Sequence, residues 1–366
     1  MSGRLPGGRA LVTGAGMEQL PSPALVVDLD AFEANVATAE KLLAGTGTRL
    51  RPHVKTHRTP GLALRQLGGV ADGVTCATLG EAEVMADAGI AEVFIANEVV
   101  APDKLARLAA LAARANVTVA VDDAAVAEAL GAAARRAGSV VDVLVDIDIG
   151  LGRCGVPTPA DAATLAGVVA GTPGLRLAGI MGYEGRVTTL GAERTAELGR
   201  YYDLLAETRA AVERAGFEVG TVSSAGTSTI REAAVDPTIT EIQAGTYALM
   251  EAGLQDLELP FLHAVSVLAT VISRSPAQVV LDAGRKSLAC DYGFPLLLDD
   301  GGEVSDVNEE HTIVAWPTGT PPPVGARLAL RPGHVRLTFN LHPQVWLARG
   351  EEVVDELPVT AGRHSQ

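Results

Sequence analysis

Short apolar runs alternate with longer alanine-rich segments through the middle of this sequence. Short apolar runs bounded by Gly, Pro or polar residues are typical of buried strands, and the segments between them have helical spacing. An apolar run at 24–28 predicts a first strand. Eight further runs predict strands centred on residues 50–55, 73–77, 93–97, 117–121, 141–147, 177–182, 221–224 and 241–243.

Helix starts are marked between these runs. Asp30, with Glu33 three residues later, is an N-cap pattern that opens a helix to about residue 43. Pro60 stands at a first-turn position, and Thr78 is placed to cap the helix that follows it. Eight strand–helix units in roughly 200 residues predict a (β/α)8 TIM barrel over residues 30–253. A doubly wound parallel sheet is the alternative, because periodicity cannot show closure.

The pattern changes after residue 253. Gly and Pro turns separate further apolar runs with little helical spacing between them, and these runs predict an all-β domain over residues 254–366. The strand at 24–28 is one more than the eight strands that a barrel needs, so we assign it to this second domain. The strands expected after residue 253 lie at 263–273, 278–282, 311–315, 327–331 and 335–347.

The first 20 residues are rich in Gly and predict a flexible leader. Residues 10–16 invite a dinucleotide-loop interpretation, but the third Gly at the required offset is missing and Pro21 and Pro23 follow. We therefore reject a nucleotide site here. No apolar core of a signal peptide precedes Gly14.

Composition narrows the class of protein. The chain has 366 residues, of which 48% are hydrophobic and 20% charged, which suits one large domain and a smaller one. A formal net charge of −15 and a pI near 4.9 disfavour nucleic acid or an anionic membrane as a partner. Cys76, Cys154 and Cys290 form no CxxC pair, so we expect a cytoplasmic protein without disulfides. No apolar run approaches the roughly 20 residues that span a bilayer.

The stretch Arg51-Pro-His-Val-Lys-Thr-His57 carries the first candidate chemistry. If the strand at 50–55 continues through it, His53, Lys55 and His57 share one face, because strand side chains alternate. A desolvated lysine beside cationic groups becomes an amine nucleophile, and its common use is to bond the carbonyl of pyridoxal 5′-phosphate (PLP). A basic, solvent-facing strand end is the alternative for this stretch taken alone.

Polar or Gly-rich segments follow several predicted strands, at the end where a barrel gathers its functional side chains. Residues 223–228, Ser-Ser-Ala-Gly-Thr-Ser, lead into a helix and offer N–H groups and hydroxyls suited to a phosphate. A lysine, a phosphate cradle and an arginine are the groups that PLP needs. Taken alone, each of them is also found in ordinary turns that bind no ligand. The other polar strand ends are Asn97 and Glu98, the segment from Asp146 to Arg153, Tyr183, and residues 243–247.

Seven motifs together carry a resemblance to a known family. They are Pro21-Ser-Pro-Ala-Leu-Val-Val-Asp28, Arg51-Pro-His-Val-Lys-Thr-His57, Asn97-Glu-Val-Val100, Gly152-Arg-Cys-Gly-Val156, Glu241-Ile-Gln-Ala-Gly-Thr-Tyr247, Asp282-Ala-Gly-Arg-Lys-Ser287 and His334-Val-Arg-Leu-Thr-Phe-Asn-Leu-His342. From Pro21 onward the chain resembles the fold-type III PLP enzymes, and within them the D-threonine aldolase and D-serine dehydratase group. The resemblance implies an alanine racemase-like barrel with a β-domain, and a homodimer whose active site is shared between subunits.

The resemblance also implies roles for single residues. Lys55 is similar to the lysine that bonds PLP, and Arg153 to the arginine that hydrogen-bonds the 3′-oxygen of PLP. Tyr183 matches a tyrosine placed against the cofactor ring, and a core tyrosine with a satisfied hydroxyl is the alternative. The residues at cofactor- and phosphate-binding positions are Ser224, Gly226, Thr227, Gln243, Gly245 and Thr246.

The chain departs from the family at its divalent metal site. The family's ligands are a histidine and, two residues later, an aspartate or cysteine, which point the same way on a strand. His334 matches, but the second position is Arg336, and a guanidinium has no lone pair to give. We therefore expect the Mn, Mg or Zn ion to be absent and Arg336 to supply a fixed charge or bind an acidic group of the substrate. His311, after Glu310, resembles a Glu-His pair of the family, whereas we expect His342 to be a satisfied strand histidine.

The resemblance implies a PLP-dependent lyase that acts on D-3-hydroxy amino acids, with retro-aldol cleavage to glycine and an aldehyde as the preferred reaction. The expected catalytic residues are Lys55, Tyr183, His334, Arg336 and His311. D-Serine dehydratase-like β-elimination and a metal-free amino-acid racemase or epimerase are the alternative enzymes. A PLP carrier is the alternative outside enzymes, and the appended β-domain argues against it.

Overall fold

The fold is given by a computed structural model that describes residues 14, 16–298 and 301–362. The chain divides into two compact units. Among the described residues, the barrel unit comprises Asn35–Ala248, Leu254–Phe261 and 360–362, and the β unit comprises those up to Ala34, Leu249–Gly253 and those within Leu262–Val359. The boundary that we expect at residues 253 and 254 stays a prediction.

The barrel unit contains an eight-stranded parallel sheet in the order β2-β9-β8-β7-β6-β5-β4-β3. Every neighbouring pair in this order is parallel, as the predicted strand–helix alternation requires. Its strands are β2 (Arg49–Leu50), β3 (Val74–Cys76), β4 (Glu92–Glu98), β5 (Asn116–Val121), β6 (Val141–Asp146), β7 (Leu175–Met181), β8 (Thr221–Ser224) and β9 (Glu241–Ile242).

The ends of this sheet meet through a single bridge. His53, just beyond β2, forms a parallel bridge with Thr75 in β3. The Thr75 N–H donates to the Pro52 carbonyl across 2.9 Å, while the His53 N–H donates to the Ala244 carbonyl across 3.1 Å. The segment after β2 is therefore hydrogen-bonded on both sides. This closes the sheet into the predicted (β/α)8 class and excludes the doubly wound alternative.

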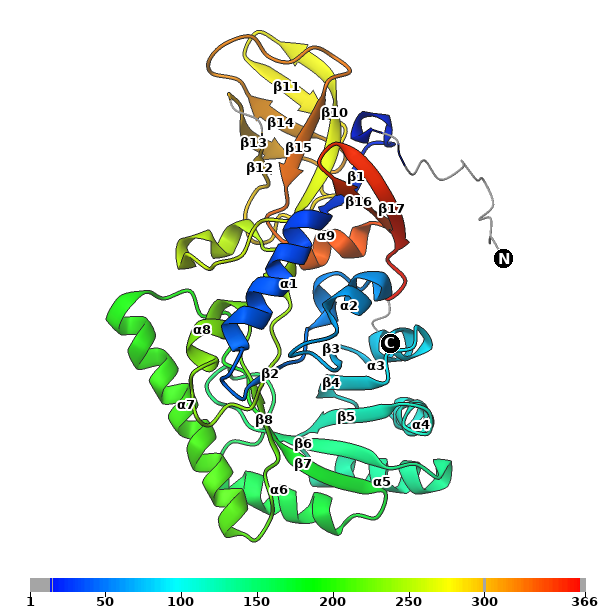
Figure 1. Cartoon of the computed structure of the whole chain (residues 1–366), viewed down its shortest axis with the longest axis vertical. Coiled ribbons are helices and arrows are strands. Elements are labelled where there is room, and N and C mark those ends of the chain that lie inside the picture. The colour runs from blue at the N-terminus through cyan, green and yellow to red at the C-terminus, as the bar shows by residue number, and fades with distance from the viewer. Residues whose placement is uncertain (1–13, 15, 299–300, 363–366) are drawn as a thin grey trace. The chain divides into compact units, whose positions relative to one another are not determined.

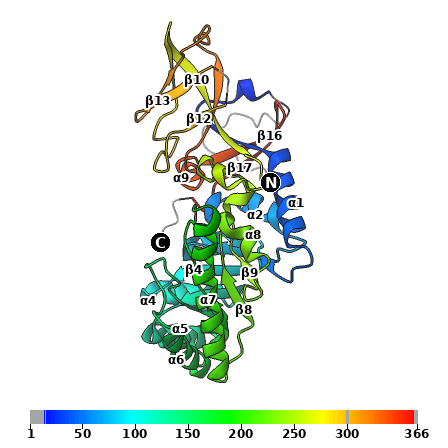
Figure 2. The same cartoon turned by 90° about the vertical axis from the view of Figure 1, so that its left-hand side faces the viewer.

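Helices cover the outside of this sheet (Figures 1 and 2). Most of their starts follow the sequence signals: Pro60 and Pro102 lie in first turns, and the Thr78 hydroxyl accepts the Glu81 N–H across 3.1 Å. The predicted N-cap Asp30 is wrong, because that helix begins at Leu29 and the Asp28 carboxylate accepts the Ala31 N–H across 3.0 Å. Inside the sheet, adjacent strands contribute Phe94, Ala120, Leu144 and Met181 to one buried layer. The helices are α2 (Pro60–Gln66), α3 (Leu79–Asp87), α4 (Pro102–Leu111), α5 (Ala124–Ala137), α6 (Pro159–Gly171), α7 (Gly191–Arg214) and α8 (Ile230–Ala233), and α1 (Leu29–Leu43) precedes β2.

The β unit contains a nine-stranded, mostly antiparallel sheet with the main order β13-β14-β11-β10-β1-β16-β17, in which β15 pairs with β10 and β12. Figure 1 shows β10, β11 and β13 to β15 as the yellow and orange arrows. Its strands are β1 (Ala24–Asp28), β10 (Val265–Ser275), β11 (Gln278–Leu281), β12 (Leu296–Leu297), β13 (Glu303–Val307), β14 (Thr312–Ala315), β15 (Arg327–Arg331), β16 (Gln344–Arg349) and β17 (Glu352–Pro358).

The first strand of the chain belongs to this sheet. β1 pairs antiparallel with β10 and parallel with β16. Its side chains Ala24 and Val26 pack with Leu268 and Trp346 in one buried cluster of the β unit. The predicted strand that is not needed for the eight-stranded barrel thus pairs with β10 and β16, which lie far from it in the sequence.

The predicted strand at 335–347 is wrong in its first half, because Val335–Leu341 is a helix, α9. Apolar residues alternate with polar ones here, which predicts a strand, but Val335, Thr338 and Phe339 also have helical spacing and are the buried residues. Leu337 is 42% exposed. The Thr338 hydroxyl donates to the His334 carbonyl across 2.8 Å and stabilises the first turn.

Most of the predicted flexible leader, residues 1–13 and 15, lies outside the described residues. The rest of it packs on the β unit: Gly16 forms an antiparallel bridge with Glu352, and Leu20 is buried. Across the described ranges, no helix combines the length and apolar character that crossing a membrane requires.

Candidate active site

Lys55 lies on a turn and not on a strand, which corrects the predicted strand at 50–55. Val54–Thr56 forms a 3-10 helix. Pro52 brings no N–H to the sheet, and the His57 N–H donates back to the Val54 carbonyl across 3.0 Å. His53, Lys55 and His57 therefore do not share a strand face. The turn presents the half-buried Lys55 beyond the carboxyl end of β2.

His57 does not act as a cationic neighbour of Lys55. Its ring is fully buried, its Nδ1 accepts the Thr59 N–H across 3.1 Å, and its Nε2 lies 2.8 Å from the Gln66 side-chain oxygen. The ring proton is therefore on Nε2. Burial lowers the pKa of His57 to about 4, so the ring is neutral at pH 7. Gln66 in turn donates to the Tyr247 hydroxyl across 2.9 Å, which ties the Lys55 turn to the segment after β9.

Tyr183 brings together the two cationic residues that the sequence predicts for the site. The Lys55 Nζ lies 5.7 Å from the centroid of its ring, and the guanidinium carbon of Arg153 lies 5.9 Å from the same centroid. A Cβ on Gly226 would lie 3.4 Å from the Tyr183 hydroxyl oxygen. The carboxyl ends of β2, β6, β7 and β8 thus meet at one aromatic ring, as a barrel site requires.

The segment after β8 forms the predicted cradle, and a residue that sequence reasoning missed supports it. Glu184 is 4% exposed, and its carboxylate accepts the Ala225 N–H across 3.2 Å and the Thr229 hydroxyl. Ala225 has φ +66°, a left-handed conformation that a non-glycine residue rarely adopts. Burial raises the pKa of Glu184, although its hydrogen bonds oppose this effect. The signal available in the sequence was an acidic residue directly after the predicted Tyr183.

The hydroxyls and N–H groups of the cradle have defined partners. The Gly226 N–H donates to the Thr229 hydroxyl across 3.1 Å, so this glycine serves the cradle mainly through its lack of a side chain. The buried Thr227 hydroxyl accepts the Tyr247 N–H across 2.9 Å and can still donate its own proton. Ser224 is fully buried, and its hydroxyl lies 3.4 Å from the Glu184 carboxylate.

A buried polar network supports the ends of β8 and β9. Glu241 accepts the Arg51 Nε–H across 2.8 Å and the Ser223 hydroxyl across 2.7 Å. The Gln243 side chain donates to the same Ser223 hydroxyl across 3.0 Å. The predicted cofactor residue Gln243 is thereby fixed in the structure by side chains of the barrel. Thr246, buried at 4% exposure, follows in the next 3-10 turn, Thr246–Ala248.

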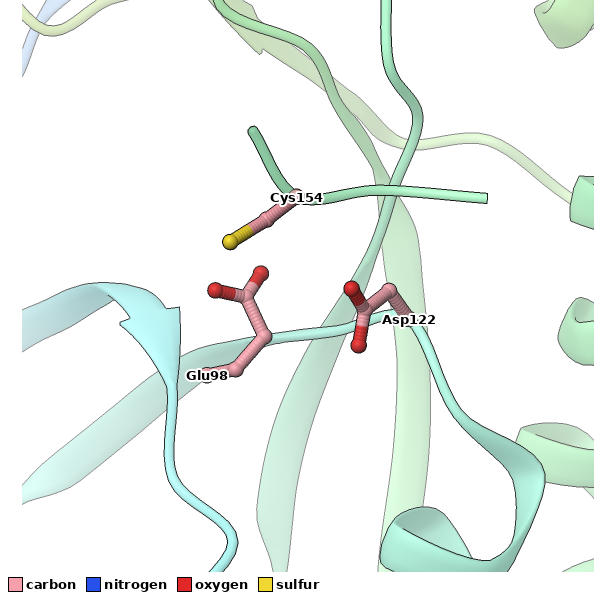
Figure 3. Close-up of side chains that lie close together, drawn as sticks. All are labelled: Glu98, Asp122 and Cys154. Carbon is pink, nitrogen blue, oxygen red and sulfur yellow. The ribbon is translucent and has the colours of Figure 1, made fainter. Parts of the chain in front are cut away.

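Acidic groups gather at the carboxyl ends of β4, β5 and β6. Figure 3 shows Glu98, Asp122 and Cys154 with their side-chain ends turned toward one another, and their ligand-type atoms all lie within 4.8 Å of each other. Burial raises the pKa of Asp146, aided by the charge of Glu98 and a hydrogen bond to it. Burial likewise raises the pKa of the Cys154 thiol to about 11, and that thiol hydrogen-bonds to Glu98. Asp146 and the Cys154 thiol therefore both carry a proton beside Glu98 at pH 7.

The residues around Tyr183 fit PLP. The cofactor is an anionic aldehyde, and the site offers an amine on Lys55, a guanidinium on Arg153 and the Thr227 hydroxyl. Gly226 leaves room beside the tyrosine ring at a point where a side chain would fill it. The amine of Lys55 suits the aldehyde of such a ligand, and the hydroxyls and N–H groups of the cradle suit its phosphate.

His334 and Arg336 are in contact in the β unit. The Arg336 Nε–H donates to the His334 Nε2 across 3.1 Å, and the His334 Nδ1–H bonds to the Asp291 carboxylate. The Arg336 Nη2 lies 3.4 Å from a carboxylate oxygen of Glu251, which is 1% exposed. The Tyr292 ring stacks on His334 at 4.2 Å between centroids, and the guanidinium carbon lies 5.6 Å from its centroid. Asp291, Tyr292 and Glu251 were not among the predicted residues.

The remaining predicted histidines have ordinary surroundings. His311 is exposed between β13 and β14, and its carbonyl accepts the Asn308 N–H across 2.8 Å. His342 is not in a strand but ends α9, where its Nε2 lies 2.9 Å from the Ser287 carbonyl oxygen. A catalytic role for His311 stays a prediction.

A cavity of about 320 Å³ opens at the opposite end of the barrel, between the amino ends of β5, β6 and β7. It includes Asn116 and Ser139 and is bordered by the ion pair of Arg176 with Asp142. Barrel enzymes carry out their chemistry at the carboxyl ends of the strands, so we give this cavity no part in the site.

Comparison with known proteins gives this fold and site a family. The alanine racemase N-terminal domain matches residues 27–252, and a putative serine dehydratase domain matches residues 264–348. The chain therefore belongs to the fold-type III PLP enzymes, in the group that joins an alanine racemase-type barrel to a serine dehydratase-type domain.

Three curated relatives show which enzymes of this family the chain is similar to. The chain is 38% identical over 357 residues to a D-threonine aldolase from an Arthrobacter species, covering 95% of this chain and 94% of the relative. It is 33% identical to a 3-hydroxy-D-aspartate aldolase from Paracoccus denitrificans, with 95% and 94% covered. It is 30% identical to a D-threo-3-hydroxyaspartate dehydratase from a Delftia species, with 88% and 93% covered.

Solved structures of the same family superpose on this chain. A D-threonine aldolase from Filomicrobium marinum superposes with a TM-score of 0.92 at 39% identity, covering 97% of this chain and 99% of that one. A variant of a D-threo-3-hydroxyaspartate dehydratase in its metal-free form has a TM-score of 0.84 at 27% identity, covering 94% and 98%. An alanine racemase from Bacillus anthracis, at 16% identity and a TM-score of 0.70, shares the fold alone; it covers 92% of this chain and 97% of its own.

Proposed function

We propose that this chain is a PLP-dependent lyase that cleaves D-3-hydroxy amino acids to glycine and an aldehyde. The observation that carries the proposal is the convergence of Lys55 and Arg153 on the Tyr183 ring, at 5.7 Å and 5.9 Å from its centroid. Similarity to a D-threonine aldolase over almost the full length of both chains supports the reaction.

The proposed cofactor contacts come from the strand ends. Lys55 would bond the aldehyde carbon of PLP, and Arg153 would donate to an oxygen on its ring. The Tyr183 ring would border the cofactor, because both residues already lie within 5.9 Å of its centroid. The phosphate would bind at the segments after β8 and β9, through Ser224, Gly226, Thr227, Gln243, Gly245 and Thr246.

Bound PLP withdraws electrons from Cα of an amino acid and so stabilises negative charge left there. The residues of the chain then select the bond that breaks. If a base removes the proton of the 3-hydroxyl, the O–H electron pair forms the aldehyde C=O and the Cα–Cβ pair remains on Cα. Cα finally takes up a proton, which yields glycine. We assign this last proton to the Lys55 amine.

His334 is the proposed base for the 3-hydroxyl proton. Asp291 holds the hydrogen on Nδ1, so the lone pair is on Nε2. This lone pair accepts the hydroxyl proton once the Arg336 Nε–H that it binds turns to the hydroxyl oxygen. The Arg336 guanidinium, 3.1 Å from that nitrogen, is an adjacent fixed positive charge that would stabilise negative charge on the hydroxyl oxygen.

Dehydration is the second candidate reaction. Similarity to a D-threo-3-hydroxyaspartate dehydratase at 30% identity favours it. In that reaction a base removes the Cα proton and hydroxide leaves from Cβ, so the products are a 2-oxo acid and ammonia. The same cofactor and the same lysine serve both reactions, and the products distinguish them.

We further propose a cytoplasmic homodimer that shares its active sites. The β unit leaves large apolar side chains 41% to 45% exposed within residues 292–298, namely Tyr292, Phe294, Leu296 and Leu298. Large apolar side chains gathered in one exposed stretch of the chain suit a protein partner, and the family resemblance makes a second copy the proposed one. The cysteines Cys76, Cys154 and Cys290 are free, which suits a reducing compartment.

The first experiment tests the cofactor and the reaction together. Purified protein is loaded with PLP and scanned in the visible range, and it is then incubated with D-threonine, D-serine or L-alanine while aldehyde, ammonia and enantiomer are assayed. We expect a yellow protein that releases aldehyde from D-threonine. Lys55→Ala should lose the visible band and the activity, whereas Lys41→Ala, a change at an exposed lysine of α1, should keep both. A colourless protein that takes up no PLP would refute the proposal.

A further inference from the structure

The divalent cation of the related enzymes does not fit the residues that this chain places at the matching position. The family resemblance puts that cation on His334 and on the residue two positions later, which here is Arg336. A guanidinium stays protonated and has no lone pair to offer a metal. In addition, the His334 Nε2 accepts the Arg336 Nε–H across 3.1 Å, and Nδ1 is held by Asp291. Both ring nitrogens are therefore engaged by side chains.

The charges in this cluster indicate what the guanidinium does. Glu251 is 1% exposed, and a buried carboxylate requires a cation or hydrogen-bond donors around it. Its Oε1 lies 3.4 Å from the Arg336 Nη2, while its Oε2 is buried and has no hydrogen-bond partner within the described residues. A single polar contact thus leaves Glu251 dependent on the positive charge of Arg336.

Replacing the divalent cation and its anionic ligand with an arginine leaves the net charge of the site unchanged. A divalent cation with one aspartate or thiolate ligand contributes a net charge of +1, and a guanidinium also contributes +1. His334 is present in both cases and is neutral as a metal ligand. Replacing the anionic ligand with arginine therefore removes the metal ion and keeps the positive charge beside the imidazole and above the buried Glu251.

We propose that in this chain the guanidinium of Arg336 takes the place of the family's divalent cation, and that the chain binds no divalent ion at His334. The stacking of Tyr292 on His334 and the 5.6 Å approach of the guanidinium to the Tyr292 ring hold the three side chains together. The statement about binding does not depend on the lyase activity. Only the use of this charge at the substrate hydroxyl rests on the proposed function.

Manganese binding tests the proposal without an activity assay. The PLP-loaded full chain is freed of metal with a chelator, and bound Mn²⁺ per chain is counted by electron paramagnetic resonance. The variants are Arg336→Asp, the same change combined with His334→Ala, and Arg274→Asp. The last makes the same charge change at an exposed residue of β10, whose guanidinium bonds the Pro321 carbonyl.

We expect no Mn²⁺ that depends on His334 in the unmodified chain or in Arg274→Asp. Arg336→Asp should bind one ion per chain at least about 100-fold more tightly, because a guanidinium some 5 Å from a divalent ion opposes binding strongly. His334→Ala in that background should abolish the site. Circular dichroism checks folding. If the loss of the Glu251 counter-charge unfolds Arg336→Asp, Arg336→Cys with Zn²⁺ replaces it, because a thiol can be neutral before the metal binds.

Two results would overturn the proposal. One is stoichiometric Mn²⁺ in the unmodified chain that His334→Ala removes. The other is a folded Arg336→Asp or Arg336→Cys variant that binds no ion, because Arg336 would then not stand at a metal position. Failure of the lyase assay with the expected Mn²⁺ results would reject the proposed function and leave this inference intact.

Discussion

A Cβ atom on Gly245 would lie 2.4 Å from the carbonyl oxygen of His53. The segment after β9 therefore contacts the turn that carries Lys55 at a point where a side chain does not fit. The same Cβ would lie 2.5 Å from the Thr56 hydroxyl oxygen. The position of the lysine depends on this contact between the last and first strand ends of the barrel.

Gly245→Ala should displace the Lys55 turn. We expect a loss of about 1–3 kcal/mol in the free energy of unfolding and weaker PLP binding, because overpacking against backbone forces a shift. Urea unfolding and titration of the visible PLP band measure the two effects. Gly199→Ala is the control, because Gly199 lies in α7 with nothing within 4 Å of its Cβ position. This variant should raise the free energy of unfolding by about 0.5–1 kcal/mol and leave PLP affinity unchanged. Equal PLP affinity in both variants would contradict the assigned role of Gly245.

Glu184→Gln tests the residue that supports the cradle. The amide nitrogen cannot accept a hydrogen bond, so either the Ala225 N–H and the Ser224 hydroxyl, or the Thr229 hydroxyl, lose an acceptor. We expect PLP to bind about tenfold more weakly, consistent with the loss of a hydrogen bond to a charged group. Glu207→Gln, at an exposed position of α7, should bind PLP like the unmodified chain. Unchanged PLP affinity in Glu184→Gln would mean that the cradle does not need the carboxylate.

The sequence predicted the barrel well where local pattern and long-range pairing agree. The run at 221–224 coincides with β8, which pairs in parallel with β7 and β9. The error at Lys55 has a physical cause: the alternating residues after Pro52 suit a strand, but the chain turns into the 3-10 helix Val54–Thr56 directly after the closing bridge of His53 with Thr75. That bridge joins two chain segments, so no local pattern reveals it.

The error at α9 arose because the spacing of its apolar residues fits both the period of a strand and the period of a helix. Val335 and Phe339 lie on one face of a strand and also on one face of a helix. The buried Thr338 and the exposed Leu337 decide for the helix, and burial of these residues depends on tertiary contacts. His334 and Arg336 consequently meet through a helix start, and not through the strand spacing that the prediction assumed. The contributions of Glu251 and Asp291 to this cluster come from distant segments and were not predictable.

Stability should fall as the pH rises, because of Asp146. Burial raises the pKa of Asp146 from 3.8 to about 9, so the folded chain keeps a proton that the unfolded chain has lost above about pH 4. Unfolding then releases a proton, and higher pH favours unfolding until the folded pKa is passed. We expect the free energy of unfolding to decline between pH 5 and pH 8.5, by at most about 1.4 kcal/mol per pH unit. Asp146→Asn should flatten that decline in urea titrations. An equal slope in both proteins would show that Asp146 is ionised in the fold.

The most direct test of the central claim is proton NMR of D-threonine incubated with the PLP-loaded chain in D2O. Retro-aldol cleavage predicts equal amounts of acetaldehyde and glycine, with one deuterium on the glycine Cα, and Lys55→Ala should leave D-threonine unchanged. Formation of 2-oxobutanoate and ammonium would instead establish dehydration, and exchange at Cα with a change of configuration would establish a racemase. Either of these results, or intact D-threonine with the active cofactor bound, would contradict the proposed aldolase.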